Sequence, residues 1–440
     1  MGTFSVPIFV SVCYGLLSIT KNVVMKVLKK LYKNTMLAAF AVGSAMLTSC
    51  SEDTSAKDNE TAPDSSPVMV QIEGQDACTL SDPITHKNLS VYLIRGEGKG
   101  ESMKVCTLAE AMEAKTVVVK ETGTVNQLTI ENKSKDTYVF IHSGDIVKGG
   151  KQDRTLANSI VIPPNTKPVA VQSFCVEQSR WAKRGAEDVG QFSCNTKALS
   201  SRELKMAARS FKNQGEVWRQ VASTQTKLSG NVYKGDPGNR VNSGVSATSL
   251  QLALENKDLE KMTKEYIEAI TKQMPKGDDI IGYAFAVNGE FNSADVYLSH
   301  ELFEKVWATR LDSMASEAIA ELDDKKEFTT LDAKAVSVEM ASNEKEKMSE
   351  EKLAVGNRMQ VKENDALVSF GACYSVHEAK EPVVFHYNSI SKKGLQKAPQ
   401  PQKGQMIQEY NQNSIRYNRL PNLNSANLPQ QQTQGEAEGE

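Results

Sequence analysis

The sequence predicts an α+β fold: a β-sandwich-like N-terminal half, a helical middle, and then a β-hairpin, a helix and further strands. Three observations support this prediction. Short runs rich in β-branched residues, separated by turn residues, fill positions 68–176. Apolar residues recur at helical spacing over positions 200–274. An Asn-Gly pair at 288–289 divides two further apolar runs, as in a tight hairpin.

Six runs in the N-terminal half have the length and composition of strands. They cover positions 90–94, 116–120, 125–130, 138–142, 159–162 and 169–176. Strands at such even spacing favour a sandwich over a parallel α/β sheet. Residues 108–114 are the exception, because a helical pattern there follows Thr107, a suitable N-cap residue.

The middle of the chain is predicted to be helical. Ser200 and Glu203 have the spacing of a capping box, which begins the first helix. The buried stripe of this helix recurs every seven residues, at Leu204, Phe211 and Trp218. Gly, Asn and Asp make 230–244 a loop, and a second helix over 259–274 ends before Pro275.

The C-terminal part begins with the predicted hairpin, whose arms are 280–287 and 291–298. Ser299 is expected to cap a third helix. Later strands are expected at 335–340, 366–376 and 383–387. Residues 396–440 are rich in Gln, Asn and Pro and lack an apolar period, which predicts a disordered tail.

Composition and charge exclude several classes of protein. The 440 residues include 52 Lys+Arg and 54 Asp+Glu, for a net charge of −2. This balance argues against nucleic acid as a partner, because such binding needs a strong basic field. A mean hydropathy of −0.41 argues against a protein with several membrane spans. The chain is long enough to bury a large core without a disulfide scaffold.

The N-terminus predicts a lipoprotein signal peptide at 25–49. Four lysines follow Met25, and the apolar run 36–46 is too short to span a bilayer comfortably. The run ends in Leu-Thr-Ser-Cys, which resembles the bacterial lipobox, in which the cysteine is lipidated and the peptide is cut before it. We therefore expect lipidation at Cys50, with residues 1–24 an over-extended start. Several acyl chains hold a protein stably at a membrane, whereas one holds it marginally.

The polar segment 50–70 is predicted to be a disordered tether between the anchor and the folded domain. Its acidic residues Glu52 and Asp53 resemble the signal that exports Bacteroidetes-type lipoproteins to the cell surface. The expected location is the bacterial outer membrane, at its periplasmic face or at the cell surface. The membrane is then a partner through the lipid anchor.

Two motif segments, 144–154 and 173–181, together with 281–289, are similar to a family of bacterial domains of unknown function. The family is named "ARG and Rhodanese-Phosphatase-superfamily-associated protein", where ARG means ADP-ribosylglycohydrolase. The resemblance covers roughly residues 78–390 and implies one family domain over 71–395. Within it, 71–190 is expected to be β-rich and 191–395 helical with the hairpin. The name records gene neighbourhoods suggestive of NAD or ADP-ribose metabolism and establishes no activity.

These segments supply the candidate site residues. They are Gly144, Asp145, Gln152, Arg154, Cys175, Glu177, Arg180 and Trp181. The functional interpretation is a polar pocket in which Arg180 and Arg154 bind an anion and Trp181 stacks on a ring. The structural interpretation, which we favour, is a network at the end of a strand. In it Glu177 pairs with one of the arginines, and Cys175 packs as a small apolar residue.

The sequence offers no recognisable catalytic set. Cys175 has no histidine close by that could generate a thiolate. A metal could be bound by His142 and Asp145 with His377 or His386, but no HExxH motif or carboxylate cluster is present. We therefore expect no metal and no cofactor. Cysteines beyond position 50 are odd in number, so at least one is free or paired between chains.

The favoured function is a cell-envelope lipoprotein that binds an unknown small ligand or protein partner without catalysis. One alternative is an enzyme acting on an ADP-ribose-like or other phosphorylated compound. Another is a structural component of a surface assembly that uses the tail. Convergence of the motif residues on an open concavity would favour binding or catalysis. Mutual pairing in the interior would favour the structural network.

Overall fold

The computed structural model describes residues 67–99, 103–195, 197–199, 201–341, 346–375 and 382–395. The signal peptide, Cys50, most of the tether and the tail, on which several predictions were made, lie outside these residues. Of the described residues, 28% are helical and 34% lie in strands. Helices lie in the middle and strands at both ends, which confirms the α+β class. In the described part, no helix is long and apolar enough to cross a membrane.

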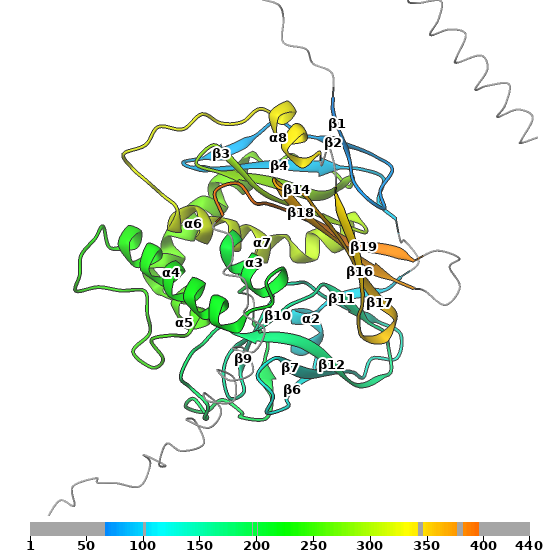
Figure 1. Ribbon diagram of the computed structural model, residues 1–440, viewed down its shortest axis with the longest axis vertical. Coiled ribbons are helices and arrows are strands. Elements are labelled where there is room, and N and C mark those ends of the chain that lie inside the picture. Colours follow the sequence, from blue (N-terminus) through cyan, green and yellow to red (C-terminus); the bar gives the residue numbers. More distant parts are fainter. Residues whose placement is uncertain are drawn as a thin grey trace, which may run out of the picture. The chain divides into compact units, whose positions relative to one another are not determined.

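The largest element is an antiparallel sheet of ten strands that joins the two ends of the domain (Figure 1). Its order is β1 (Val68–Gln71), β2 (Ala77–Leu80), β4 (Leu89–Arg95), β14 (Ile280–Val287), β15 (Glu290–Tyr297), β19 (Val383–Ser391), β18 (Leu367–Tyr374), β17 (Asn357–Glu363) and β16 (Lys347–Lys352), with β3 (Ile84–His86) pairing to β4. Because β4 pairs with β14, the first four strands belong to this sheet rather than to the N-terminal sandwich.

The sandwich-like part consists of two smaller sheets. One has the order β13 (Phe192–Ser193), β9 (Ile146–Gly149), β10 (Arg154–Leu156), β12 (Thr166–Cys175), β7 (Gln127–Asn132) and β6 (Val117–Glu121), and the other β11 (Ile160–Ile162), β8 (Tyr138–Ile141) and β5 (Val105–Thr107). Apolar side chains from both, such as Leu128 and Ile130 against Val139 and Ile141, form one buried cluster. The short helix α2 (Leu108–Glu113) has the expected cap at Thr107.

Six further helices complete the domain. They are α3 (Arg202–Arg209), α4 (Gln214–Val232), α5 (Leu250–Leu254), α6 (Lys257–Gln273), α7 (His300–Ala320) and α8 (Ala333–Met340). Helices α4, α6 and α7 share a core with one face of the large sheet, and α8 packs on its other face (Figure 1). Most of α7 is buried, so this helix is the centre of the core.

The hairpin and the cap of α7 are confirmed. Asn288 has a φ of 53° and Gly289 a φ of 73°, the positive values that a type I′ turn requires. Ser299 accepts a hydrogen bond from the amide of Leu302, which satisfies a donor in the first turn of α7.

Three expectations about helices are wrong. The residue that caps α3 is Ser201, one position after the expected Ser200, and its side chain accepts from Leu204. The expected single helix is divided by a turn into α3 and α4, and α4 continues to Val232, beyond the expected start of the loop. Residues 335–340 form helix α8 instead of a strand, because Asp332 caps the segment and Val336 and Met340, four residues apart, share the buried face.

Several strands were not among the expected runs, namely β1, β2, β3, β5, β9, β10, β13, β16 and β17. Strand β1 begins at Val68, where the β-rich pattern was expected to begin, and so includes the last residues of the predicted tether; it contributes the buried Val70 to the core. Strand β16 was missed because its charged, largely exposed residues lack apolar alternation, and β17 because Met359 and Val361 are the only apolar residues in an otherwise polar run. The five cysteines of the described part are all free, at positions 78, 106, 175, 194 and 373.

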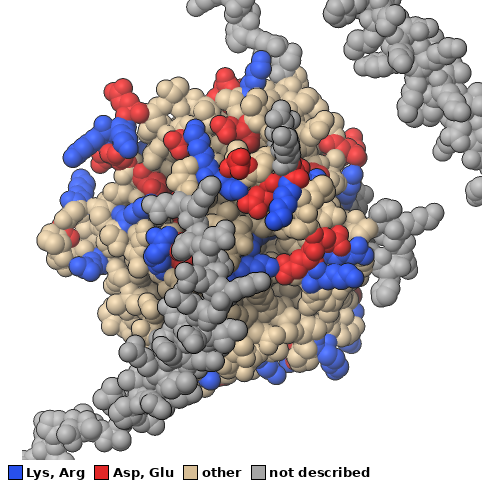
Figure 2. Space-filling model, viewed as in Figure 1, with Lys and Arg blue, Asp and Glu red and all other residues tan. Residues whose placement is uncertain are grey.

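The surface of the domain carries mixed charge. Figure 2 shows acidic and basic side chains interspersed over the described part of one face. Many of them form exposed ion pairs, such as Lys104 with Asp136. Such pairs each contribute little to stability.

Candidate functional site

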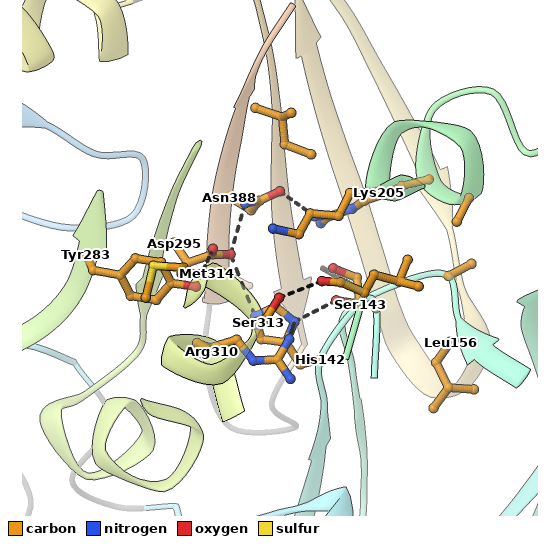
Figure 3. A pocket seen from close by; sticks show the side chains of 16 residues that line it. His142, Ser143, Leu156, Lys205, Tyr283, Asp295, Arg310, Ser313, Met314 and Asn388 are labelled. Carbon is orange, nitrogen blue, oxygen red and sulfur yellow. Dashed lines mark hydrogen bonds and ion pairs between the residues drawn. The ribbon is translucent and has the colours of Figure 1, made fainter. Parts of the chain in front are cut away.

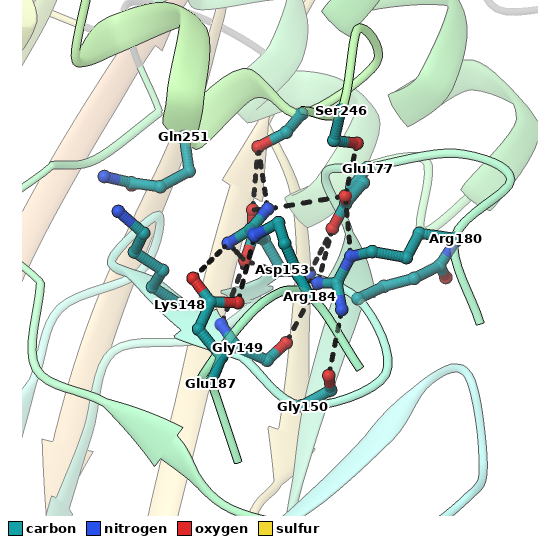
Figure 4. A network of polar contacts seen from close by, with 12 residues as sticks. Lys148, Gly149, Gly150, Asp153, Glu177, Arg180, Arg184, Glu187, Ser246 and Gln251 are labelled. Carbon is teal, nitrogen blue, oxygen red and sulfur yellow. Dashed lines mark hydrogen bonds and ion pairs between the residues drawn. The ribbon is translucent and has the colours of Figure 1, made fainter. Parts of the chain in front are cut away.

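The first group of motif residues forms a strand-end network in the interior. It consists of Asp153, Glu177, Arg180, Arg184 and Glu187 (Figure 4). Nε of Arg180 donates to Oε1 of Glu177, and Nη2 to Oε2, each over 2.7 Å. Arg184 donates in the same two-pronged way to the carboxylate of Asp153, over 2.8 Å for both bonds. Such bidentate pairs are the strong form of the arginine–carboxylate bond.

The network ties three segments of the chain together. Glu177 follows strand β12, Asp153 lies between β9 and β10, and Ser246 and Ser249 precede helix α5. The hydroxyl of Ser246 donates to Glu177 over 2.5 Å, and that of Ser249 to Asp153 over 2.7 Å. Both carboxylates also accept backbone amide protons. Helix α5 and the loop after β12 are thereby held against the smaller sheet.

These charges are compensated by one another and are not directed at a ligand. The side chains of Asp153 and Glu177 have no exposed surface, and that of Arg180 is 11% exposed. Burial alone would raise the pKa of Glu177, but the hydrogen bonds from Arg180, Ser246 and the Asp153 amide lower it below its usual value. The structure therefore agrees with the favoured structural interpretation, with Arg184 as a partner that was not anticipated.

Of the remaining residues around β12, Gln152, Arg154 and Cys175 are buried and Trp181 is half-buried. Arg154 is fully buried and donates to the backbone oxygen of Gln152 and to Glu121 rather than to Glu177. Trp181 lies over its guanidinium at 5.5 Å. Burial raises the pKa of Cys175 to about 12, so its thiol stays protonated and is not a nucleophile.

Gly144 and Asp145 belong to a different place in the fold. Gly144 has a φ of 91°, a conformation that turns the chain between β8 and β9. The carboxylate of Asp145 accepts a hydrogen bond from Nη2 of Arg310, on helix α7, over 2.5 Å. Asp145 also accepts the amide proton of His142, so the turn is joined to the core helix.

Beside this turn lies a cluster of His142, Asp295 and His386, which we call the His–Asp–His cluster. Figure 3 labels its members His142 and Asp295. His142 follows β8, Asp295 is on β15 and His386 is on β19. Nε2 of His386 donates to Oδ1 of Asp295 over 2.8 Å, and Nε2 of His142 lies 3.6 Å from the same oxygen. All three residues are buried.

Every outer atom of the cluster has a partner. Nδ1 of His142 lies 2.7 Å from the backbone oxygen of Ser143 and 3.1 Å from Nη1 of Arg310, and its Nε2 lies 3.1 Å from the hydroxyl of Tyr297. Nδ1 of His386 accepts from the hydroxyl of Ser159 over 2.8 Å. Oδ2 of Asp295 accepts from the hydroxyl of Tyr283 over 2.8 Å, and Oδ1 also accepts from Asn388.

The charge state of the cluster follows from these contacts. Burial and the nearby Arg310 hold the pKa of His142 well below 6.5, and burial lowers the pKa of His386. Burial would raise the pKa of Asp295, but hydrogen bonds from the two histidines hold it well below 3.8. The cluster therefore contains two neutral imidazoles and one carboxylate near neutral pH.

A small cavity opens beside the cluster, and we call it the Arg209 cavity (Figure 3). Its polar lining comes from His142, Lys205, Arg209, Asp295, Arg310 and Asn388. The volume is about 20 Å³, and roughly 10–15 Å³ is enough for one water molecule. It is therefore a cavity for an ion or the end of a ligand, not for a whole nucleotide.

Arg209 is the unusual residue of this cavity. It is 5% exposed, and burial lowers its pKa to about 9, so it remains a cation at neutral pH. Nη1 donates to Oδ1 of Asn388 over 2.6 Å, the guanidinium lies 4.0 Å from the ring of Phe370, and Nε has no partner. Among the described residues, no carboxylate forms an ion pair with it. Arg310 and Lys205, in contrast, lie near Asp145 and Glu317.

A serine-hydrolase arrangement is not formed, although Ser159, His386 and Asp295 are hydrogen-bonded in a row. The hydroxyl of Ser159 is buried and accepts the Ser143 amide proton. It lines none of the cavities described around it, so a substrate carbonyl cannot reach it.

Sequence reasoning thus treated the motif residues as one candidate site, whereas the structure places them in two different parts of the fold. It named His142 and His386 as possible metal ligands together with Asp145. In the structure the carboxylate beside the two histidines is that of Asp295. His377, the other histidine named, lies outside the described residues. It missed Arg209 and Arg310, which sit on helices in no motif. The one usable signal was an ionisable residue at a buried helical position, since charged residues are rarely buried without a reason.

The fold and the two polar groups define an α+β domain with a buried polar core site. Comparison with family models identifies it: the ARG and Rhodanese-Phosphatase-superfamily-associated Protein domain matches residues 77–386. The chain belongs to this family, and the expected resemblance is confirmed. Both the strand-end network and the His–Asp–His cluster fall within the match. No curated protein and no solved structure matches the chain.

Proposed function

We propose that this chain is a cell-envelope lipoprotein whose family domain binds a small anionic ligand, or the anionic end of a larger one, in the Arg209 cavity. The observation that supports binding is Arg209 itself, a buried cation without an ion-pair partner among the described residues. Burying an uncompensated charge destabilises a fold, and a bound anion would remove that cost. Phosphate and carboxylate are the groups that a guanidinium binds best.

The surroundings of Arg209 support this ligand class. Lys205 and Arg310 line the same cavity, so an anion there would meet three cationic side chains and one carboxylate, Asp295. Lys205 has 21% of its side chain exposed and can move outward to admit a group larger than water. The favoured function is binding without catalysis.

Thermal unfolding of the tag-free chain with inorganic phosphate or with ADP-ribose tests the proposal. A ligand present at 100 times its dissociation constant stabilises the native state by about 2.7 kcal/mol. We expect this stabilisation in the wild type and in Arg240→Met, whose arginine is exposed in a loop. Arg209→Met should lose it while remaining folded, because the substitution removes a buried charge. An equal shift in Arg209→Met, or no shift with either compound, would refute binding at this site.

An enzyme acting on an ADP-ribose-like or other phosphorylated compound is the second candidate. Its earlier basis is weakened, because Glu177 and Arg180 are paired with each other. The observation that favours it is that His142 and the ionised Asp295 line the same cavity as Arg209. Turnover of the compound that binds, abolished in Asp295→Asn, would establish catalysis and replace the non-catalytic proposal.

The envelope location is supported by the sequence at Cys50 and proposed on that basis. Cells grown with labelled palmitate should yield a labelled chain that fractionates with the outer membrane. Cys50→Ala should abolish both the label and the membrane association. Protease treatment of intact cells then distinguishes the cell surface from the periplasmic face. An unlabelled wild-type chain would contradict the anchor.

A further inference from the structure

We propose that the His–Asp–His cluster is a binding site for one divalent transition-metal ion. The ion would be held by Nε2 of His142, Oδ1 of Asp295 and Nε2 of His386, which all lie within 4.8 Å of one another. Imidazole and carboxylate ligands in this ratio suit Zn²⁺, Fe²⁺ and Mn²⁺. No step of this proposal depends on the anion proposed above.

The spacing of the three ligand atoms fits such an ion. Metal–ligand bonds of about 2.0–2.2 Å place neighbouring ligand atoms roughly 3.0–3.4 Å apart. The distances in the cluster, 2.8 Å from His386 to Asp295 and 3.6 Å from His142 to Asp295, lie on either side of that range. The two histidine nitrogens lie within 4.8 Å of each other, so movements of the imidazoles toward the ion would complete the coordination.

The outer atoms of the ligands are held as they are in protein metal sites. Ligating histidines donate their second ring N–H to a fixed acceptor, and ligating carboxylates are hydrogen-bonded in turn. With Nε2 of His142 on the ion, its Nδ1 would donate to the Ser143 backbone oxygen, 2.7 Å away, and Oδ2 of Asp295 accepts from Tyr283. On metal binding, the proton of His386 moves from Nε2 to Nδ1, where the oxygen of Ser159, 2.8 Å away, accepts it.

Charge around the cluster is compatible with a cation, although two arginines lie near. Arg310 is 3.1 Å from Nδ1 of His142, but its charge is compensated by Asp145. Asp295 supplies one negative charge directly to the ion. Arg209 reaches Asp295 only through the side chain of Asn388, which donates to Oδ1 of that carboxylate.

The ion would have coordination positions open to a ligand. His142 and Asp295 line the Arg209 cavity, whereas His386 closes the cluster from behind. Three protein ligands with a free position toward a cavity are the arrangement of a catalytic or ligand-binding metal, rather than of a closed structural one. Water or the anionic group of a ligand would fill that position.

Calorimetric titration of the tag-free, chelator-treated full chain tests the site, in buffer without phosphate. We expect one Zn²⁺ or Co²⁺ per chain, no comparable binding of Mg²⁺, and visible absorption bands of protein-bound Co²⁺. Tyr283→Phe, which keeps the ring and removes only the hydrogen bond to Asp295, should weaken binding by about 10–100-fold. His142→Gln should weaken it further, and His300→Gln, on the surface of α7, should bind like the wild type.

Absence of metal binding by the wild type would overturn the proposal, whether or not any variant folds. Equal binding by wild type and by folded His142→Gln and Tyr283→Phe would overturn it as well, since the metal would then lie elsewhere. Arg209→Met separates the two proposals, because it removes the anion site and should still bind the metal. Binding of metal without anion, or of anion in the presence of chelator, therefore tests each one alone.

Discussion

At the scale of single residues, the motifs gather polar side chains whose roles depend on what surrounds them. Arg180, whose side chain is 11% exposed, makes a bidentate pair with Glu177, whereas the buried Arg209 forms no ion pair with a carboxylate of the described residues. The first arrangement stabilises a loop. The second leaves a buried charge without an ion pair, which costs stability.

Glu177→Gln should strongly destabilise the domain. The substitution leaves Arg180 beside a neutral partner in the interior. It also removes the negative charge of Glu177 that lies next to Arg184. Breaking a buried pair in this way costs about 3–5 kcal/mol. Urea unfolding followed by circular dichroism measures it. Glu187→Gln, at a side chain 24% exposed, is the control and should cost no more than about 1 kcal/mol. Equal costs for the two variants would show that the buried pairs of Glu177 stabilise the fold no more than the partly exposed pair of Glu187.

At the scale of elements, local chemistry predicts a structure well where one residue type has a strict conformational requirement. The Asn-Gly pair of the hairpin and Ser299 at the start of α7 are such cases. Helix α8 was mistaken for a strand because its apolar residues fit both periods, and a short run cannot distinguish them. Strands β17 and β16 escape prediction because backbone pairing, not their own apolar pattern, makes them strands: β17 pairs with β18, and the edge strand β16 pairs with β17.

Gly289→Ala should destabilise the hairpin by more than the cost of placing an alanine at a positive φ. A Cβ at this position would lie 2.5 Å from the backbone oxygen of Thr329, and φ is 73°. Gly235→Ala is the matched control, with a φ of 78° and no neighbouring atom within 4 Å. The control should lose about 1–2 kcal/mol, the cost of a left-handed alanine. Gly289→Ala should lose roughly 1–3 kcal/mol more, the cost of overpacking, as judged by urea midpoints. Identical losses would show that Thr329 moves away freely.

At the scale of the whole molecule, the large sheet brings together residues from distant parts of the chain. Strands β15 and β19 are neighbours in this sheet and carry Asp295 and His386, and the smaller sheet containing β8 contributes His142. The cluster therefore exists only when the two sets of sheets and the core helix α7 are assembled. Its protonation is consequently linked to global stability.

Stability should fall as the pH decreases below about 6.5. Both histidines of the cluster have lowered pKa values in the folded state, whereas in the unfolded chain they titrate near 6.5. Below that pH the unfolded state binds more protons than the folded state. The contribution of the neutral histidines to the free energy of unfolding is therefore fully present above pH 6.5. It is lost as the pH falls toward their folded-state pKa values, by up to about 1.4 kcal/mol per pH unit for each histidine. Urea unfolding between pH 7.5 and 5.5 measures the slope. His386→Gln should reduce it, and a flat wild-type profile would contradict the assignment.

The sequence by itself determined the α+β class, the family, the hairpin, most strands and the caps of α2 and α7, because these depend on local spacing and on residues with strict backbone requirements. It also predicted that Glu177 and Cys175 are structural. Only the tertiary structure decided that β1–β4 join the C-terminal strands, that Arg184 completes the network, and that His142 meets Asp295 and His386 beside Arg209. Strand pairing and the burial of a charge depend on residues far apart in the chain, and no local pattern encodes which of them become neighbours.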